Sequence, residues 1–423
     1  MKVRIVDFIA NRGGGLRFAV ELVGALLRGH PDVTFELVSD RRGVAAYRAR
    51  IGEGHDNLRS CIVPSPRAHF RPLLGLLRLP GARRLAGTLD LGRLWHVDVP
   101  SAFLEGCDAV WFPWLHRHRI AWHRSGRVVA SFHDATFLLF GGLARRHPHS
   151  MFVESEREIT RRWLDSNARI VCSSRATVNE LSRIFPIAPS RLEMVRVGGD
   201  HFVATGGGDE PPPWPWLDRP YLLCPANTAL HKNHETLFRA VGSWGAKWPL
   251  VLTGEGSDLD VRWRRRALSL IAALGLVRPP RSTVLRQLAE SVGLEVGRTL
   301  HPLGFVSEPL YRVLLRCAAA LVMPTLAEGG GSFPVFEAAR LGIPALCSDL
   351  PVLREQVEHE GTPVLFFDPH RPETLAAVLA ELESNYASVR NRAMAHASGW
   401  HGRRWDDVAG EYWQLIESVA HNE

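Results

Sequence analysis

The sequence is poor in lysine. Only Lys2, Lys232 and Lys247 are lysines among 51 basic residues, so the other 48 are arginines. Together with abundant Ala, Gly, Leu and Pro, this bias is typical of a GC-rich bacterial genome, and most arginines need no functional explanation. A lysine inside a motif is therefore informative. The net charge of +7 over 423 residues favours anionic ligands or surfaces but does not indicate nucleic acid.

The sequence also lacks paired cysteines and long apolar runs. No C-x-x-C pair of a zinc or redox site occurs, and we expect reduced core thiols in a cytoplasmic protein. No stretch approaches 18 uninterrupted apolar residues, and the apolar run at the start is too short for a signal peptide. We therefore expect neither export by that route nor a membrane span. The six single cysteines are Cys61, Cys107, Cys172, Cys224, Cys317 and Cys347.

What is present is the composition of a globular protein, with 46% hydrophobic and 22% charged residues. The length predicts two or three domains. Short Val- and Ile-rich runs alternate with segments of helical period such as 16–27 and 175–184, which predicts parallel sheets with helices on both faces. The predicted strands are 3–9, 33–38, 109–112, 128–132, 170–173 and 194–197, and then 221–225, 249–253, 300–305, 319–323, 345–347 and 364–367.

A Pro-rich segment separates the two groups of strands. Residues 206–219 contain four prolines and show the hydrophobic pattern of neither a strand nor a helix, as in a semi-rigid connector. We therefore predict an N-terminal αβ domain (1–205), a linker (206–219) and a second αβ domain (220–398). The segment 258–297 reads as an irregular insertion.

The run 324–356, PTLAEGGGSFPVFEAARLGIPALCSDLPVLREQ, is the densest candidate site. A strand should end before it, and a helix should begin near Phe333 with Pro334 in its first turn. The backbone N–H groups of the intervening loop and the positive helix end would suit a diphosphate. Glu328 and Glu337 flank this element, where sugar hydroxyls could donate to them. The alternative is an ordinary helix N-cap followed by a solvated glutamate.

This run resembles the signature of the retaining family 4 glycosyltransferases of the GT-B fold, P-S-x-x-E-G-F-G-L-P-V-L-E-A-M-A-x-G-x-P-V-V-A-S-D. The family has seven residues between its two glutamates, whereas eight separate Glu328 from Glu337. By resemblance, Glu337 binds the ribose hydroxyls of the donor and Glu328 contacts its sugar. The resemblance also places Gly329, Gly330, Gly331, Ser332 and Phe333 at the donor nucleotide sugar.

Two further landmarks of the family fall in the first half. Gly13, Gly14 and Gly15 precede Leu-Arg-Phe and match the family's G-G-x-G-R-Y loop, which implies a backbone cradle near the donor phosphates or the acceptor. A turn that needs positive φ would explain the glycines equally well. His133-Asp134 follows a strand like the family's "HD". By resemblance, His133 binds a donor-sugar hydroxyl, and otherwise it is an exposed strand-end histidine; we expect Asp134 to cap the next turn.

The third landmark is the only lysine inside a motif. Residues 226–234, ANTALHKNH, resemble the family's V-G-x-x-x-x-R-K-N loop. Many relatives have an arginine six residues before the lysine, where this chain has Ala226. Lys232 would then be the main cation on the leaving diphosphate. The alternative is a solvated surface lysine.

Two other signals favour plainer interpretations. Asp258 and Asp260 mimic a metal-binding D-x-D, but in a polar loop of the wrong architecture, so we expect no metal. The segment 71–89, together with Arg41, Arg42 and the arginines at 48 and 50, could lie on an anionic membrane. Pro72 and Pro80 interrupt that segment, which favours a helix pair of the N-terminal domain.

The resemblance implies an α/β protein of GT-B fold with two Rossmann-like domains facing a cleft. The N-terminal domain would bind the acceptor, the C-terminal domain would bind the nucleotide sugar, and a helix in 399–423 would cross back to the N-terminal domain. It implies retaining transfer of a mannose- or glucose-type hexosyl group from a GDP- or UDP-sugar to a glycan or lipid-linked acceptor in bacterial surface polysaccharide synthesis. It implies no essential metal and no cofactor. The alternatives are a catalytically silent nucleotide-sugar-binding or scaffold protein and a GT-B epimerase or phosphorylase.

Overall fold

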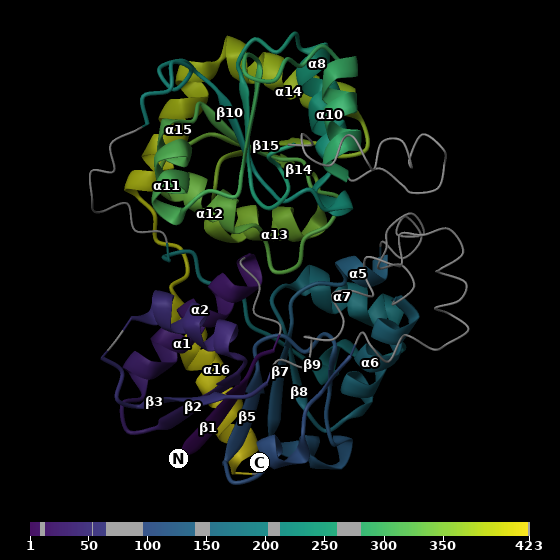
Figure 1. Cartoon of the computed structure of the whole chain (residues 1–423), viewed down its shortest axis with the longest axis vertical. Helices are drawn as coiled ribbons and strands as arrows, with labels where there is room; N and C mark the ends of the chain where they lie inside the picture. The colour runs from purple at the N-terminus through teal and green to yellow at the C-terminus, as the bar shows by residue number, and fades with distance from the viewer. Residues whose placement is uncertain are drawn as a thin grey trace. The chain divides into compact units, whose positions relative to one another are not determined.

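The computed structural model describes residues 1–8, 13–52, 54–64, 96–139, 153–201, 212–259 and 281–421. The chain forms two compact units (Figure 1). The first unit contains Met1–His201, Gly329–Gly331 and Arg403–Glu423, and the second contains Phe202–Glu328 and Ser332–Gly402. The segment 71–89 and Asp260 lie outside the described residues.

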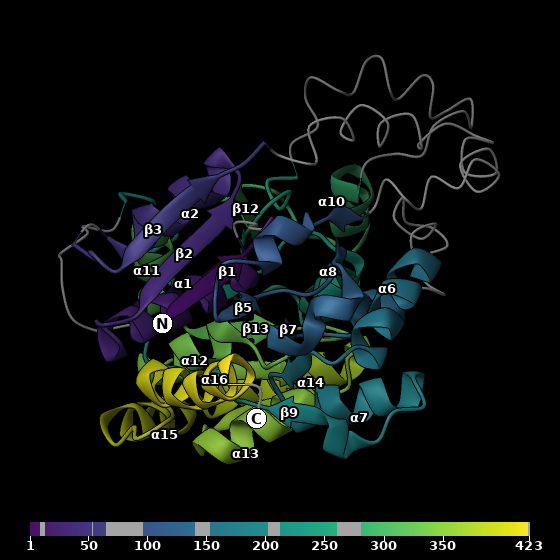
Figure 2. The same cartoon turned by 90° about the horizontal axis from the view of Figure 1, so that it is seen from below.

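Each unit is built around a parallel sheet. In the described part of the first unit the sheet has seven strands in the order β3-β2-β1-β5-β7-β8-β9. Figure 2 labels β3, β2, β1, β5 and β7 in that succession. Its strands are β1 (Lys2–Val6), β2 (Thr34–Ser39), β3 (Leu58–Ile62), β5 (Ala109–Phe112), β7 (Val128–Phe132), β8 (Arg169–Cys172) and β9 (Leu192–Met194). The short strands β4 (Val97–Asp98) and β6 (His118–Arg119) pair separately.

Two helices of the first unit are capped at their N-termini by local side chains. Asp40 accepts a hydrogen bond from the Gly43 amide at 2.7 Å, and Ser174 accepts one from the Thr177 amide at 3.0 Å, so both satisfy N–H groups of a first helical turn. The helices are α1 (Gly14–Gly29), α2 (Arg41–Ile51), α5 (Thr136–Leu139), α6 (Val153–Asp165), α7 (Arg175–Ile184) and α16 (Trp405–Ala420).

The last helix completes the first unit, although it comes from the end of the chain. α16 packs against α1 and reaches β5 and β7 (Figure 1). The Tyr412 hydroxyl lies 2.9 Å from Ser131 Oγ, which also accepts a 3.1 Å hydrogen bond from the Trp111 indole. Because all three side chains are buried, this junction fixes the helix on the sheet.

The sheet of the second unit has six strands among the described residues, in the order β12-β11-β10-β13-β14-β15. They are β10 (Leu222–Pro225), β11 (Leu250–Thr253), β12 (Leu300–Gly304), β13 (Ala320–Met323), β14 (Ala345–Ser348) and β15 (Val364–Phe367). The helices are α8 (His234–Ser243), α10 (Arg281–Ser291), α11 (Glu308–Cys317), α12 (Phe333–Arg340), α13 (Pro351–Glu360), α14 (Pro372–Ser384) and α15 (Tyr386–Ser398).

Three sequence predictions need correction. The strand predicted at 194–197 is β9, Leu192–Met194, because the chain then leaves the sheet and Gly198 packs tightly against the backbone at Trp405. The irregular insertion predicted at 258–297 contains α10, which buries Leu285 and Ala289 one helical turn apart. The thiols are all free, but only four are buried: Cys61 is half-buried and Cys317 is exposed.

Each sheet reverses its strand order at one point. In the first sheet the reversal lies between β1 and β5, and in the second between β10 and β13. The loops at the carboxyl ends of strands beside such a point are where open α/β sheets bind ligands. No helix among the described residues is long and apolar enough to cross a membrane.

Candidate functional site

The loop after β10 holds Lys232 in a fixed position. Leu230–Lys232 form one 3₁₀ turn, and Asn233 then takes the left-handed conformation with φ of 52° before α8 begins. The side-chain amide of Asn233 donates from Nδ2 to the Pro369 carbonyl at 2.8 Å, and the Thr236 hydroxyl donates to the same oxygen at 3.0 Å. These bonds anchor the end of the loop to the segment after β15.

The loop after β13 is tied to the loop after β10. The Leu326 amide donates to the His231 carbonyl at 2.6 Å, and the Thr325 hydroxyl lies 3.1 Å from the same oxygen. Because β10 and β13 are neighbouring strands at the reversal point, these bonds set the two loops side by side at one edge of the sheet. This placement of the loops brings Lys232 of the first loop close to Glu328 of the second.

Lys232 and Glu328 form an ion pair at that edge. Nζ of Lys232 lies 2.5 Å from Oε1 of Glu328, and the side chains are 17% and 13% exposed. The lysine is therefore not a solvated surface residue. The structure brings together two of the side chains that the sequence singled out 96 positions apart, and it places a cation and a carboxylate where a phosphate and a sugar hydroxyl could each take one partner.

The helix after Glu328 begins where the sequence predicts. α12 starts at Phe333 with Pro334 in its first turn, which confirms that prediction. Gln356 of α13 holds the start: its Oε1 accepts from the Ser332 amide at 2.7 Å, and its Nε2 donates to the Ser332 carbonyl at 3.1 Å. The side chain of one helix therefore fixes the backbone at the beginning of the other.

Glu337 is fully buried on α12. The Tyr311 hydroxyl of α11 donates to Oε2 of Glu337 at 2.5 Å. A buried carboxylate is costly unless hydrogen-bonded, so the tyrosine helps to keep Glu337 at this position. The interpretation of Glu337 as a solvated glutamate is wrong.

Gly329–Gly331 pack with the first unit. The Ser174 hydroxyl donates to the Gly329 carbonyl at 2.9 Å, and the Thr177 hydroxyl lies 3.2 Å from the same oxygen. A Cβ atom on Gly329 would overlap the His133 carbonyl, so the close approach requires glycine. The segment therefore lies beside His133, and its binding to a donor phosphate stays a prediction.

His133 is buried at the carboxyl end of β7, not exposed. Its Nε2 lies 2.8 Å from the Pro113 carbonyl, which can only accept, so Nε2 carries the proton and the Ser173 hydroxyl donates to Nδ1 at 2.6 Å. Burial lowers the pKa of His133 to about 4, and the ring is neutral at pH 7. A sugar hydroxyl would have to replace one of these two hydrogen bonds. Asp134 accepts from the Thr136 amide at 3.0 Å, which confirms its predicted capping role.

The N-terminal glycines start α1. Gly13 is the N-cap with an extended φ of −100°, and Gly14 and Gly15 form the first turn. None of these three has positive φ, so left-handed backbone does not account for them. The amides of Leu16 and Arg17 donate to the Gly13 carbonyl. Donor or acceptor binding by this turn stays a prediction.

No group of three or more His, Cys, Asp or Glu side chains with the spacing of a metal site occurs among the described residues, and metal independence stays a prediction.

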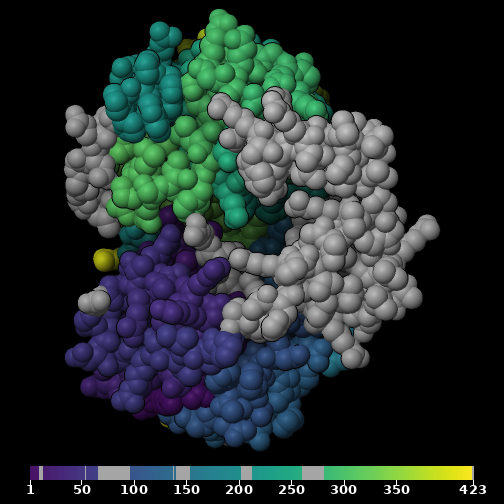
Figure 3. Space-filling model, in the orientation of Figure 1, coloured from purple at the N-terminus to yellow at the C-terminus, as the bar shows by residue number. Residues whose placement is uncertain are grey.

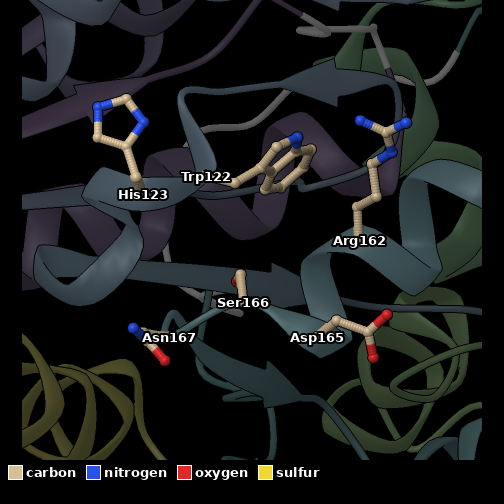
Figure 4. Close-up of a pocket in the computed structure, with 6 residues that line it drawn as sticks. All are labelled: Trp122, His123, Arg162, Asp165, Ser166 and Asn167. Atoms are coloured by element: carbon tan, nitrogen blue, oxygen red, sulfur yellow. The ribbon is translucent and has the colours of Figure 1, made fainter.

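An open pocket of about 420 Å³ is lined by residues that precede β7 and β8, at the amino ends of those strands (Figure 4). These are Trp122, His123, Arg162, Asp165, Ser166 and Asn167.

Sequence reasoning missed the residues that hold the site in place. Tyr311 lies outside the run 324–356, and Gln356 ends that run but lies beyond the family signature. Their bonds to Glu337 and Ser332 join separate helices. Thr325 is the second residue of that run, and a hydroxyl two residues after the end of β13 was the one available signal for it.

Part of the chain matches a known protein family. Residues 210–398 match the family model of the glycosyl transferases group 1. These residues belong to that family. The match covers the β10 and β13 loops and α12, so the candidate site lies inside the matched region.

Relatives extend the similarity to the whole chain. O-antigen chain mannosyltransferase B of Escherichia coli is 25% identical over 296 residues, which are 66% of this chain and 68% of the relative. Sucrose-phosphate synthase of Thermosynechococcus elongatus has a TM-score of 0.64 at 14% identity, with 100% of both chains covered. HepE of Anabaena, solved with UDP and glucose, has a TM-score of 0.62 at 13% identity over 99% of this chain and 100% of that one. The predicted GT-B fold with two parallel-sheet αβ domains is confirmed.

Proposed function

We propose that this protein is a glycosyltransferase that moves a hexosyl group from a nucleoside diphosphate sugar to an acceptor hydroxyl with retention of configuration. The observation that carries the proposal is the Lys232–Glu328 pair at the reversal point of the second sheet, followed along the chain by α12 with its buried Glu337. A GDP- or UDP-linked mannose or glucose is the donor that we favour. The mannosyltransferase relative supports mannose, and the UDP and glucose bound to HepE support UDP and glucose.

The ion pair suggests how the donor would be held. An arriving diphosphate competes with Glu328 for the Lys232 ammonium, because two phosphates carry more charge than one carboxylate. Glu328 is then released to accept hydrogen bonds from sugar hydroxyls, while Glu337 accepts them from the ribose. Lys232 stabilises the negative charge that develops on the leaving diphosphate. In the retaining reaction the leaving phosphate oxygen takes the acceptor proton, and no protein nucleophile takes part.

A donor panel tests the proposal. The wild-type chain is incubated with UDP-glucose, GDP-mannose and ADP-glucose, and nucleotide release is followed with and without a saccharide acceptor. We expect release from one donor, increased by the acceptor, with the anomeric configuration kept. Thermal stabilisation by a nucleotide without any transfer would instead identify a silent binding protein. A product altered in the sugar ring would identify an epimerase.

We further propose a glycan or lipid-linked acceptor and contact with an anionic membrane on the cytoplasmic side, in bacterial surface polysaccharide synthesis. The six free thiols fit a reducing compartment. α2 carries four arginines and no acidic residue, on the surface drawn in indigo in Figure 3. Arg41 and Arg42 are exposed there. Sedimentation with vesicles containing anionic lipid tests the contact, and binding unaffected by Arg41→Gln with Arg42→Gln would contradict it.

A further inference from the structure

Two buried histidines lie next to each other at the carboxyl edge of the first sheet. His116 belongs to the loop after β5, and His133 ends β7. The Trp114 ring stands beside both, with ring centroids 5.5 Å from His116 and 4.8 Å from His133. The first unit therefore concentrates two imidazoles and an indole beside its reversal point, and the family resemblance assigns a donor-sugar contact to only one of them, His133.

The hydrogen bonds of His116 require a second proton on the ring or on its partner. Nε2 lies 3.1 Å from the Asp134 carbonyl, which can only accept, so Nε2 carries a proton. Nδ1 lies 2.7 Å from Oε1 of Glu156, a group that accepts when ionised. One further proton is therefore shared between His116 and Glu156. The pair is deeply buried, with side chains 8% and 2% exposed.

The pKa values of the two histidines are thus shifted in opposite directions. The hydrogen bonds of His133 fix it as a neutral ring. Burial by itself would lower the pKa of His116, but the hydrogen bond to Glu156 and its charge outweigh burial, and the pKa of His116 is raised. The charge of His116 adds in turn to the causes that lower the pKa of His133.

We propose that the His116–Glu156 pair is a positioning device for the His133–Asp134 loop, and that loss of its shared proton sets the alkaline limit of sugar transfer. The pair joins three elements: the loop after β5, the start of α6 and, through the Asp134 carbonyl, the loop after β7. Without the shared proton, the Nδ1 lone pair faces the Glu156 carboxylate, and two acceptors repel. Among the described residues, the other titratable groups around the pair are Asp134, His133 and His96, whose ring lies 3.3 Å from the Ser155 carbonyl.

The direction of the effect follows from the raised pKa. Stability from the pair is complete below the pKa of an unfolded histidine and is lost as pH rises through the higher pKa of folded His116. The effect on transfer rests on the proposed function, whereas the shared proton itself is a property of the fold.

Glu156→Gln is the sharpest variant. The amide of glutamine can donate to an unprotonated Nδ1 while Nε2–H still donates to Asp134, so every hydrogen bond of the neutral ring is kept and only the titrating proton is removed. Glu158→Gln is the matched control, because Glu158 lies on the same helix but pairs with the exposed Arg162 at 2.8 Å.

The test uses the full chain and two measurements between pH 6 and 10. Side-chain ¹⁵N NMR of the histidines needs no donor; we expect His116 to lose a proton above the usual histidine range and the His133 nitrogen signals to shift in the same step. In Glu156→Gln both steps disappear, and in Glu158→Gln both remain. Transfer with the donor from the panel should lose its alkaline limb only in Glu156→Gln.

The outcomes separate the two proposals. A His116 that titrates like a free histidine, or a His133 signal that ignores the His116 step, would overturn the positioning device. An alkaline limb unchanged in Glu156→Gln would overturn its role in transfer. Absence of transfer from every donor would overturn the proposed function while leaving the NMR result decisive for the pair.

Discussion

Lys232 and Glu328 lie in loops that follow neighbouring parallel strands, and their charged groups are 2.5 Å apart. The ammonium is therefore already held by a carboxylate, on a loop fixed through Asn233 and Thr236. A diphosphate would meet a cation whose position is set before it arrives, and such preorganisation is what makes charge stabilisation effective.

The first prediction concerns the rate of transfer. Lys232→Ala removes the cation assigned to the leaving diphosphate, so we expect turnover to fall by a factor of about 100 or more, as when one preorganised donor is lost. Steady-state rates at saturating donor and acceptor measure it. Lys232→Arg should rescue only part of the rate, because its planar fork is wider than the ammonium.

Lys247→Ala is the matched control for this prediction. Lys247 also pairs with a glutamate, Glu383 at 2.7 Å, but its side chain is 51% exposed. We expect wild-type turnover from it. A Lys232→Ala enzyme that keeps more than about a tenth of wild-type turnover would show that another group, such as Arg17, neutralises the diphosphate.

The second prediction concerns the bond from Tyr311 to Glu337. Tyr311→Phe removes a hydrogen bond to a buried carboxylate, which should cost about 1 to 3 kcal/mol of the free energy of unfolding. Urea denaturation measures this loss. Tyr386→Phe is the control, because its hydroxyl has no hydrogen bond within the described part of the chain. Equal stability of the two variants would mean that Glu337 does not depend on Tyr311.

A third prediction follows from the clamp on Ser332. Gln356→Leu leaves the Ser332 amide and carbonyl without their partner, so both the free energy of unfolding and nucleotide affinity should fall. Denaturation and nucleotide titration of the same preparation measure the two effects. Gln287→Leu changes an exposed glutamine of the same unit and should alter neither. Full nucleotide affinity in Gln356→Leu would show that donor binding does not depend on the fixed start of α12.

The fourth prediction concerns metal ions. Transfer should survive EDTA, and Asp258→Asn should be nearly silent, because the proposed charge stabilisation comes from Lys232. Rates before and after chelation measure it. Loss of activity that manganese restores would require a metal-dependent mechanism.

Much of the fold could be predicted because buried parallel strands are continuous apolar runs. β5, β7 and β15 lie at their predicted limits. β3 was not predicted, since it is an edge strand whose mixed sequence LRSCI leaves Arg59 and Ile62 exposed. Its pairing with β2 depends on tertiary contacts that periodicity does not report.

The site was predictable only where a motif marks it. The motif identified Lys232 and Glu328, and their pairing follows from strand order, which the sequence does not state. The partners of Glu337 and His133, namely Tyr311 and Ser173, come from separate elements with no local signal. Likewise, the spacing of Glu328 and Glu337 did not indicate that Gly329–Gly331 pack with the first unit.

The central claim is that the β10 and β13 loops, with Glu337 of α12, bind a nucleoside diphosphate. Calorimetric titration of the wild-type chain with UDP, GDP and ADP tests it most directly, alongside Glu337→Gln and the exposed control Glu358→Gln. We predict that one nucleotide binds, that Glu337→Gln weakens it by a factor of about 10 to 100, as expected for hydrogen bonds to a charged group, and that Glu358→Gln does not. Absence of binding by all three nucleotides, or equal affinity in Glu337→Gln, would contradict the account.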